Sequence, residues 1–333
     1  MRSVIVTGGA GYIGSHVCKT LKSAGITPIT LDNLSQGHRR AVKWGPLVEA
    51  DISDRAALLK LVQEYTPFAA IHLASSINVR DSLKNPFFYY QNNVVASLRL
   101  LENLCEAGVK NFVFSSSAAV YGQPQTYPIS EEHPKLPTHP YGKSKLMVEE
   151  ILQDLHSAYG LTFAALRYFN ASGADPEGEV GESHNPETHL IPLVLASAMG
   201  RGPTLRINGE DFSTPDGTAI RDYIHVTDLA EAHLKALLWI CENKKCLTIN
   251  LGKGQGYSVR EIISAVERVT GRTVSVEVGP RFIEDPTALV ADPKKAQTLL
   301  NWMPQLSSLE TIISTAHRWH LQLPAREMDV NGR

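Results

Sequence analysis

The stretch TGGAGYIG, residues Thr7–Gly14, lies between the β-branched run Val4–Val6 and a segment whose apolar residues recur at helical spacing. Its glycines satisfy G-x-G-x-x-G, counted from Gly9, and the related G-x-x-G-x-x-G, counted from Gly8. Side chains at these positions would block a tight turn and the approach of a pyrophosphate to backbone N–H groups, and the positive end of a following helix attracts phosphate. A strand, this turn and a helix in succession predict a dinucleotide-binding unit.

A carboxylate stands 18 residues beyond the last glycine of the turn, where the second strand should end. Asp32 at this position is expected to accept hydrogen bonds from the two ribose hydroxyls of NAD and to repel the 2′-phosphate of NADP. Asp51, after the third expected strand, can reach the adenine or cap the next helix, and the sequence leaves both readings open. The predicted cofactor is therefore NAD.

The first half of the chain alternates short apolar runs with helical patterns, which is typical of a parallel sheet with crossover helices. Because strands buried on both faces are apolar throughout, these runs predict a doubly wound α/β Rossmann sheet. The expected strands are Ser3–Val6, Pro28–Leu31, Leu47–Ala50, Ala69–Leu73, Asn111–Phe114 and Phe163–Leu166, and the expected helices are Gly14–Ala24, Asp54–Tyr65, Tyr89–Ala107 and Tyr141–Tyr159.

The composition shifts near Ser172, which predicts a second, smaller mixed α/β substrate lobe. We expect a nucleotide-binding domain over residues 1–172, with a return segment near 221–243, and a substrate-binding lobe over 173–333. Ala174–Glu187 shows no periodicity and is expected to be a surface loop. Elements expected in the smaller lobe include Leu247–Leu251, Ser258–Val269, Thr273–Val278 and a helix starting at Asp292-Pro293.

The composition excludes several classes of protein. A length of 333 residues suggests about two domains, and a hydrophobic content of 43% with 20% charged residues is ordinary for a globular chain. A formal net charge of −2 argues against nucleic-acid binding through a basic face. No apolar run has the roughly 18–20 residues of a membrane span, and no leader is recognisable, so no membrane partner and a cytoplasmic location are expected. Four scattered cysteines predict neither disulfides nor a metal site.

Two further motifs predict proton-transfer chemistry. Tyr141 and Lys145 form Y-x-x-x-K at the start of an expected helix, so both side chains share one face. An adjacent ammonium and an oxidised nicotinamide are expected to lower the phenol pKa towards the working range. Ser115–Ser117 follow a parallel strand, at the edge of the sheet where ligands bind. Ser117 can therefore hydrogen-bond a reacting hydroxyl and pass its proton to Tyr141.

With these motifs in order, the sequence resembles the extended short-chain dehydrogenase/reductase family and, within it, the nucleotide-sugar 4-epimerases. The resemblance covers nearly the whole chain. Its landmarks are Thr7–His16, Asp32–Leu34, Tyr90–Val94, Asn111–Gly122, Tyr141–Glu149, Arg167–Asn170, His189–Pro192 and Asp216–Leu229.

The resemblance implies NAD-dependent 4-epimerisation of a UDP-hexose, either UDP-glucose/UDP-galactose or their N-acetyl forms, through a transient 4-keto sugar. It implies Tyr141 as the base, Ser117 as the proton relay and Lys145 as a ligand of the nicotinamide ribose. The expected NAD-binding residues are Gly8, Gly11, Tyr12, Ile13, Gly14, Asp32, Asn33, Asp51, Ile52, Leu73, Ala74, Ser75, Asn93, Ser115, Tyr141, Lys145, Tyr168 and Phe169. The expected substrate-binding residues are Ser117, Asn170, His189, Leu190, Arg221, Asp285 and Leu289.

The two residues after Ser117 limit the reactions that this chain can catalyse. Related dehydratases carry an Asp-Glu pair there and decarboxylases a Glu, whereas this chain has Ala118-Ala119. Elimination therefore lacks its acid and base, and simple epimerisation remains.

Other positions depart from the epimerase pattern and bear on the substrate. Ile77 stands where the family usually has a Lys near the nicotinamide ribose, Asn208 where an aromatic packs on uracil, and Phe282 where an Arg binds the diphosphate. Leu289 replaces a bulky Tyr that excludes N-acetyl groups in some members, which predicts acceptance of acetylated sugars.

Alternative functions remain open from the sequence alone. One is an epimerase or oxidoreductase acting on another nucleotide sugar, such as a UDP-uronate that Arg80 would accommodate, and another is a non-enzymatic dinucleotide sensor. The resemblance also implies a homodimer, formed through helices near Tyr89–Ala107 and Tyr141–Tyr159.

Overall fold

The computed structural model describes residues 2–323 and contains one large parallel sheet. Its strand order is β10-β6-β5-β4-β1-β2-β3, and every neighbouring pair is parallel. This confirms the predicted doubly wound α/β class, and the order reverses between β1 and β4, where such sheets bind ligands. The strands are β1 (Ser3–Thr7), β2 (Thr27–Asp32), β3 (Leu47–Glu49), β4 (Ala69–His72), β5 (Asn111–Ser117), β6 (Thr162–Tyr168) and β10 (Leu247–Leu251).

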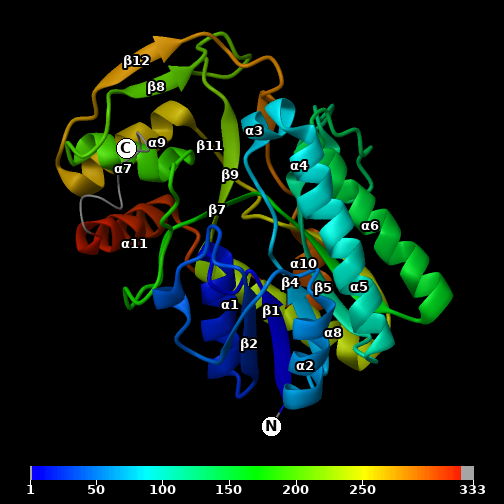
Figure 1. Ribbon diagram of the computed structural model, residues 1–333. Helices are drawn as coiled ribbons and strands as arrows, with labels where there is room; N and C mark the ends of the chain where they lie inside the picture. The colour runs from blue at the N-terminus through cyan, green and yellow to red at the C-terminus, as the bar shows by residue number, and fades with distance from the viewer. Residues whose placement is uncertain (1, 324–333) are drawn as a thin grey trace.

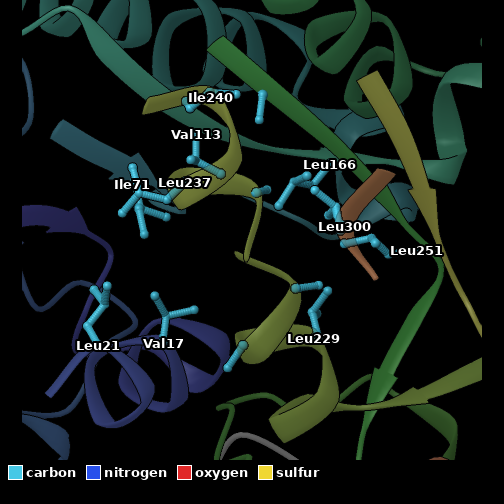
Figure 2. Packing of buried hydrophobic residues seen from close by; sticks show 14 of the residues in the cluster. Val17, Leu21, Ile71, Val113, Leu166, Leu229, Leu237, Ile240, Leu251 and Leu300 are labelled. Atoms are coloured by element: carbon cyan, nitrogen blue, oxygen red, sulfur yellow. The ribbon is translucent and has the colours of Figure 1, made fainter. Parts of the chain in front are cut away.

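Helices cover both faces of this sheet (Figure 1). The first face carries α1 (Tyr12–Ser23), α8 (Val226–Asn243) and α10 (Lys294–Leu300), and the second carries α2 (Arg55–Tyr65), α5 (Ala96–Glu106) and α6 (Pro140–Tyr159). Figure 2 shows the first core, in which α1 and α8 pack against the strands through Val17, Leu21, Leu229 and Leu237. Fully burying each such side chain stabilises the fold by about 1.5–3 kcal/mol.

Two expectations about the sheet need correction. Leu247–Leu251, expected in the smaller lobe, is the seventh strand of the large sheet, because its side chains are almost all buried and it pairs with β6. The return segment also begins differently: β9 (Ile220–His225) belongs to a small sheet, although its Ile224 and the following α8 pack in the core of the large one.

The remaining elements form a smaller lobe, drawn above and to the left of the large sheet in Figure 1. It holds a four-stranded sheet of β7 (Asn170–Ser172), β9, β11 (Gly256–Ser258) and β13 (Ala288–Leu289), and a pair β8 (Leu205–Asn208) and β12 (Val276–Gly279). Helices α7 (Leu190–Ala198), α9 (Val259–Thr270) and α11 (Leu309–Gln322) pack on a separate apolar cluster. The expected helix Ser258–Val269 and strand Thr273–Val278 correspond to α9 and β12.

Three local expectations differ in detail. The predicted helix Tyr89–Ala107 consists of α4 (Pro86–Tyr90), a π-helical turn over Gln91–Val95, and α5. The helix expected at Asp292 starts at Lys294, although the Asp292 carboxylate still accepts the Lys294 N–H at 3.1 Å. The loop Ala174–Glu187 is largely irregular but is not purely a surface segment, because Ala174, Val180 and Glu182 are buried. Across residues 2–323, no helix is both long and apolar enough to span a membrane.

Candidate active site

The glycine-rich turn has the geometry that a dinucleotide pyrophosphate requires. Gly8 adopts a φ of +69°, and a Cβ on Gly14 would lie 2.1 Å from the Gly8 carbonyl oxygen, so only glycine fits there. Gly11 precedes α1 and has no side chain that could accept a hydrogen bond. Gly11 therefore does not cap the N–H groups of the first turn, which include those of Tyr12 and Ile13. A cavity of about 300 Å³ opens beside the turn.

Asp32 lies at the end of β2 and links the turn to the second strand. Its two carboxylate oxygens accept the N–H groups of Ala10 at 3.0 Å and Leu34 at 2.8 Å. Asn33 donates to the Asp51 carboxylate at 3.2 Å. Asp51 does not cap α2, because Asp54 does so through the Ala57 N–H. Partial burial acts to raise the pKa of Asp51, but hydrogen bonds from Ser53 and Asn33 lower it overall.

The loop after β4 completes this side of the groove. A Cβ on Gly8 would lie 2.7 Å from the Ala74 N, so the first and fourth strands end in direct contact. Leu73 and Ala74 donate to Thr7, and the buried Ser75 Oγ has no hydrogen-bond partner within the described chain. A glycine cradle, an uncapped helix start, a carboxylate at the second strand and an orphaned hydroxyl fit a bound NAD.

Asn93 occupies the π-helical turn and is only 2% exposed. Its amide exchanges two hydrogen bonds of 2.9 Å with the Ser76 backbone and donates to Ser144 Oγ at 3.2 Å. Asn93 therefore joins the loop after β4 to α6. These contacts hold the loop in place, and the expected contact of Asn93 with NAD stays a prediction.

The three expected catalytic side chains converge where β5 ends and α6 begins. Ser117 is the last residue of β5 and its Oγ accepts the Ala119 N–H at 3.1 Å. Gly142 allows α6 to approach, since a Cβ there would lie 2.6 Å from the Ala119 carbonyl oxygen. Tyr141, 8% exposed, is thereby placed near Ser117, whose hydroxyl acts to lower the pKa of the phenol.

Lys145 lies one turn further along α6 and is 3% exposed. Its Nζ donates to the Ser115 carbonyl oxygen at 2.8 Å and lies 5.8 Å from the centre of the Tyr141 ring. Burial lowers the pKa of Lys145 to about 7, against the opposing charge of Glu149.

The expected lowering of the Tyr141 pKa includes the charge of an oxidised nicotinamide and stays a prediction, whereas the chain without NAD shows the opposite direction. Burial raises the pKa of this phenol, and only the hydrogen bond from Ser117 acts in the other direction. The physical reason is that the pocket favours neutral groups and Lys145 is itself a weakened cation there. Additional positive charge is needed in the pocket to favour the phenolate.

Several residues that support this group were not singled out from the sequence. His139 caps α6 by accepting the Gly142 N–H, and its ring stacks on Tyr141 with centroids 6.0 Å apart. Behind Lys145, Glu149 accepts two hydrogen bonds from Arg167, at 2.9 and 2.6 Å, and one from Ser116. A histidine before a helix, such as His139, and a glutamate eight residues after a tyrosine, such as Glu149, are weak signals in a sequence. Their roles depend on burial, which the sequence alone does not show.

The expected substrate residues gather on the small sheet. Asn170 on β7 pairs with Tyr223 of β9, and Leu289 on β13 pairs with Arg221 of the same strand. Arg221 donates to the carbonyl oxygens of Ile220 and Pro286, both at 2.8 Å, and lies 3.9 Å from the Asp285 carboxylate. The sheet thus brings four of the predicted residues, distant in sequence, to one place.

The other expected residues lie nearby or are already engaged. Tyr168 pairs in register with Ser117, and Phe169, the next residue, is buried. Leu190 begins α7, whereas the His189 Nδ1 is 2.8 Å from Glu182 and 3.2 Å from Glu187. Ile52 is buried beside Asp51.

The structure shows the contacts and exposure of the positions that bear on the substrate. The Arg80 guanidinium lies 5.0 Å from the centre of the Phe282 ring, and that of Arg281 lies 3.9 Å from the Phe212 ring. Asn208 ends β8, opposite Gly279, and Ile77 is 44% exposed. Both arginines therefore stack on aromatic rings.

The fold and this arrangement define a nucleotide-dependent enzyme of the epimerase and dehydratase type. The chain belongs to the NAD dependent epimerase/dehydratase family, whose sequence profile matches residues 4–252. It is 46% identical over 318 residues to a UDP-glucose 4-epimerase of Rhizobium leguminosarum bv. trifolii, covering 96% of this chain and 97% of the relative.

Solved structures agree with this assignment. The UDP-glucose 4-epimerase from Brucella ovis in complex with NAD is 49% identical with a TM-score of 0.93, covering 95% of this chain and 98% of that one. The enzyme from Bifidobacterium longum in complex with NAD+ and UDP is 36% identical with a TM-score of 0.92, covering 97% and 99%.

Proposed function

We propose that this chain catalyses NAD-dependent 4-epimerisation of a UDP-hexose, interconverting UDP-glucose and UDP-galactose through a transient 4-keto sugar. The observation that carries the proposal is the placement of Tyr141 at the carboxyl edge of β5, where Gly142 packs on the Ala119 carbonyl just beyond Ser117. That edge adjoins the glycine turn and the switch point between β1 and β4. The named activities of the relatives support the same reaction.

The reaction needs a group that removes and returns one proton at the sugar C4 hydroxyl. Tyr141 is placed for this role, with Ser117 relaying the proton from the sugar to the phenol oxygen. NAD, when bound, supplies the acceptor and donor of the C4 hydride. Lys145, fixed by the Ser115 carbonyl, contributes positive charge beside the phenol when protonated. The low exposure of Tyr141 and Lys145 keeps water from the proton path.

A division of labour between the two parts of the chain belongs to this proposal. The large sheet and residues 1–172, with α8 and β10, hold NAD, and the smaller lobe holds the nucleotide sugar. Asn170, Leu190, Arg221, Asp285 and Leu289 would contact the substrate, with Arg221 facing the diphosphate. The modest volume of Leu289 leaves room for an N-acetyl group, so acetylated UDP-hexosamines are included as substrates.

The Tyr141→Phe variant tests the assigned proton-transfer group. Removing the phenol oxygen should abolish epimerisation while NAD stays bound, because Tyr141 is not part of the glycine cradle. Tyr159→Phe is the matched control, since Tyr159 is 63% exposed at the opposite end of α6 and should keep full activity. Near-normal turnover in Tyr141→Phe would refute the assignment.

The alternative function of an oxidoreductase, which would release its cofactor in each turnover, is distinguished from an epimerase by the net change in NAD and NADH. An epimerase consumes neither NAD nor NADH over many turnovers, whereas an oxidoreductase changes absorbance at the NADH band in proportion to product.

A homodimer is also part of the proposal. The neighbouring helices α4, α5 and α6 expose Phe87, Phe88, Leu98 and Met147, with Phe87 87% exposed. Light scattering after gel filtration should give twice the chain mass, and a monomer at micromolar concentration would refute it. We place the enzyme in the reducing cytoplasm because its four cysteines are unpaired.

A further inference from the structure

Four metal-ligating side chains converge in the segment that connects β7 to α7. They are Glu182, His184, Glu187 and His189, spaced E-x-H-x-x-E-x-H, and one ligand atom from each lies within 4.8 Å of all the others. No proton or hydride transfer of the proposed epimerisation uses this cluster, although His189 is also one of the expected substrate-binding residues. Its His184 ring contacts the Tyr12 ring, edge to face, with centroids 6.4 Å apart.

The imidazole–carboxylate distances within the cluster are close to the ligand separations around a tetrahedral ion. The His184 Nδ1 lies 3.2 Å from Glu182 and 3.6 Å from Glu187, and the His189 Nδ1 lies 2.8 and 3.2 Å from the same carboxylates. A tetrahedral Zn²⁺ with bonds of about 2.0–2.2 Å separates its ligand atoms by about 3.3–3.6 Å. The four imidazole–carboxylate distances therefore lie within about 0.5 Å of the tetrahedral range, and the four ligand atoms lie within 4.8 Å of one another.

The two buried carboxylates of the cluster carry negative charge that a bound cation would stabilise. The side chains of Glu182 and Glu187 are 6% and 8% exposed, and two buried carboxylates need positive charge nearby. The His184 Nδ1 is buried and makes no hydrogen bond with acceptable geometry in the described chain, although it faces both carboxylates. Two neutral imidazoles, two carboxylates and one divalent cation give a neutral site.

A second acidic group nearby shows the contrast. Asp175, Glu177 and Glu179 also come together, but the Lys19 Nζ lies among them at 2.9, 2.6 and 2.7 Å. That group already has its cation from the protein. Among residues 2–323, the side chains paired with Glu182 and Glu187 are the imidazoles of His184 and His189.

We propose that Glu182, His184, Glu187 and His189 form a closed tetrahedral Zn²⁺ site that fixes the segment 182–189 against the glycine-rich turn. Two nitrogen and two oxygen ligands suit Zn²⁺, whereas Mg²⁺ and Ca²⁺ prefer sites made of oxygen. Four protein ligands leave no open position, so the ion is structural. Glu187 is oriented by the N–H groups of Thr188 and His189, at 2.7 and 2.8 Å. His184 lines the cavity beside the turn, which provides an entry path.

The alternative is an ion-pair network that holds protons in place of a metal. Burial acts to lower the pKa of His184, but Glu182 and Glu187 outweigh it and raise the value to about 9. Such a network would be satisfied without any ion, and it predicts no stoichiometric metal.

The test uses the full chain with its NAD retained. The protein is stripped with a chelator, loaded with Zn²⁺ alone and desalted, and its metal content is measured by mass spectrometry. We expect one Zn²⁺ per chain. Co²⁺ in its place should give the intense visible bands of tetrahedral coordination, while weak octahedral bands or no retained metal would overturn the site.

Variants separate this site from adventitious binding. His184→Asn and Glu187→Gln should each weaken Zn²⁺ binding by at least about 100-fold, since even outer-shell changes cost 10–100-fold. Glu177→Gln, which alters the group around Lys19, should bind as the unchanged protein does. Equal binding by all three variants would overturn the proposal. The wild-type Co²⁺ spectrum decides the question even if a variant does not fold.

Discussion

Glu149→Gln should destabilise the protein more than any comparable change at an exposed ion pair. The Glu149 and Arg167 side chains are 8% and 4% exposed, and they form a two-pronged hydrogen-bonded pair behind the catalytic strand. The charge of Glu149 and its hydrogen bonds raise the pKa of Arg167, despite its burial, so Arg167 stays charged. Removing the carboxylate leaves a guanidinium buried without a counter-charge.

The expected loss is about 3–5 kcal/mol of unfolding free energy, the usual cost of breaking a buried pair on one side. Glu102→Gln is the control, because its partner Arg99 and Glu102 itself are 64% and 51% exposed, and it should cost less than about 1 kcal/mol. The double variant Glu149→Met with Arg167→Met should recover most of the loss, since no buried charge remains.

Urea unfolding followed by circular dichroism measures all four proteins under the same conditions. Losses of similar size in Glu149→Gln and Glu102→Gln would refute the reasoning, as would a double variant less stable than Glu149→Gln. The negative charge of Glu149 also acts to raise the pKa of Lys145 against the effect of burial. In Glu149→Gln, Lys145 should therefore lose its proton at a lower pH. The alkaline limb of the activity profile of this variant should shift to lower pH.

Three further predictions concern the turn, the sugar pocket and acid stability. Gly14→Ala should lose bound NAD and about 1–3 kcal/mol of stability, because its Cβ would overlap the Gly8 carbonyl; a variant purified with full NAD content would contradict this. Leu289→Tyr should suppress turnover of UDP-N-acetylhexosamines selectively, whereas equal loss on both sugars in parallel assays would sink the idea. Burial lowers the pKa of His72 to about 3, so the neutral His72 ring contributes its full share to the free energy of unfolding above pH 6.5. That share is lost on acidification towards pH 3, at about 1.4 kcal/mol per pH unit. His72→Gln should flatten the pH dependence of urea unfolding in that range, and an unchanged slope would count against it.

The large sheet was predictable because its strands are buried on both faces and its turn chemistry is specific. The glycine turn, Asp32 and the pairing of Ser117 with Tyr141 follow from local spacing and from the rule that parallel strands end at one edge. The seventh strand was misplaced because Leu247–Leu251 pairs with β6, some 80 residues earlier, and no local pattern encodes that pairing.

The parts missed from the sequence depend on burial. The raised pKa of Tyr141 comes from desolvation, which spacing alone does not reveal. The carboxylates of Glu182 and Glu187 lie in a segment without periodicity, so it was expected to be an exposed loop. The approach of Gly142 to the Ala119 carbonyl, which sets the position of Tyr141, is likewise a contact between distant segments.

The most direct test of the proposed reaction is proton NMR of the anomeric region after incubation of the purified protein with UDP-galactose and no added NAD. The account predicts that UDP-glucose accumulates to equilibrium with no change in total bound cofactor. A folded, NAD-containing preparation that forms no UDP-glucose would contradict it.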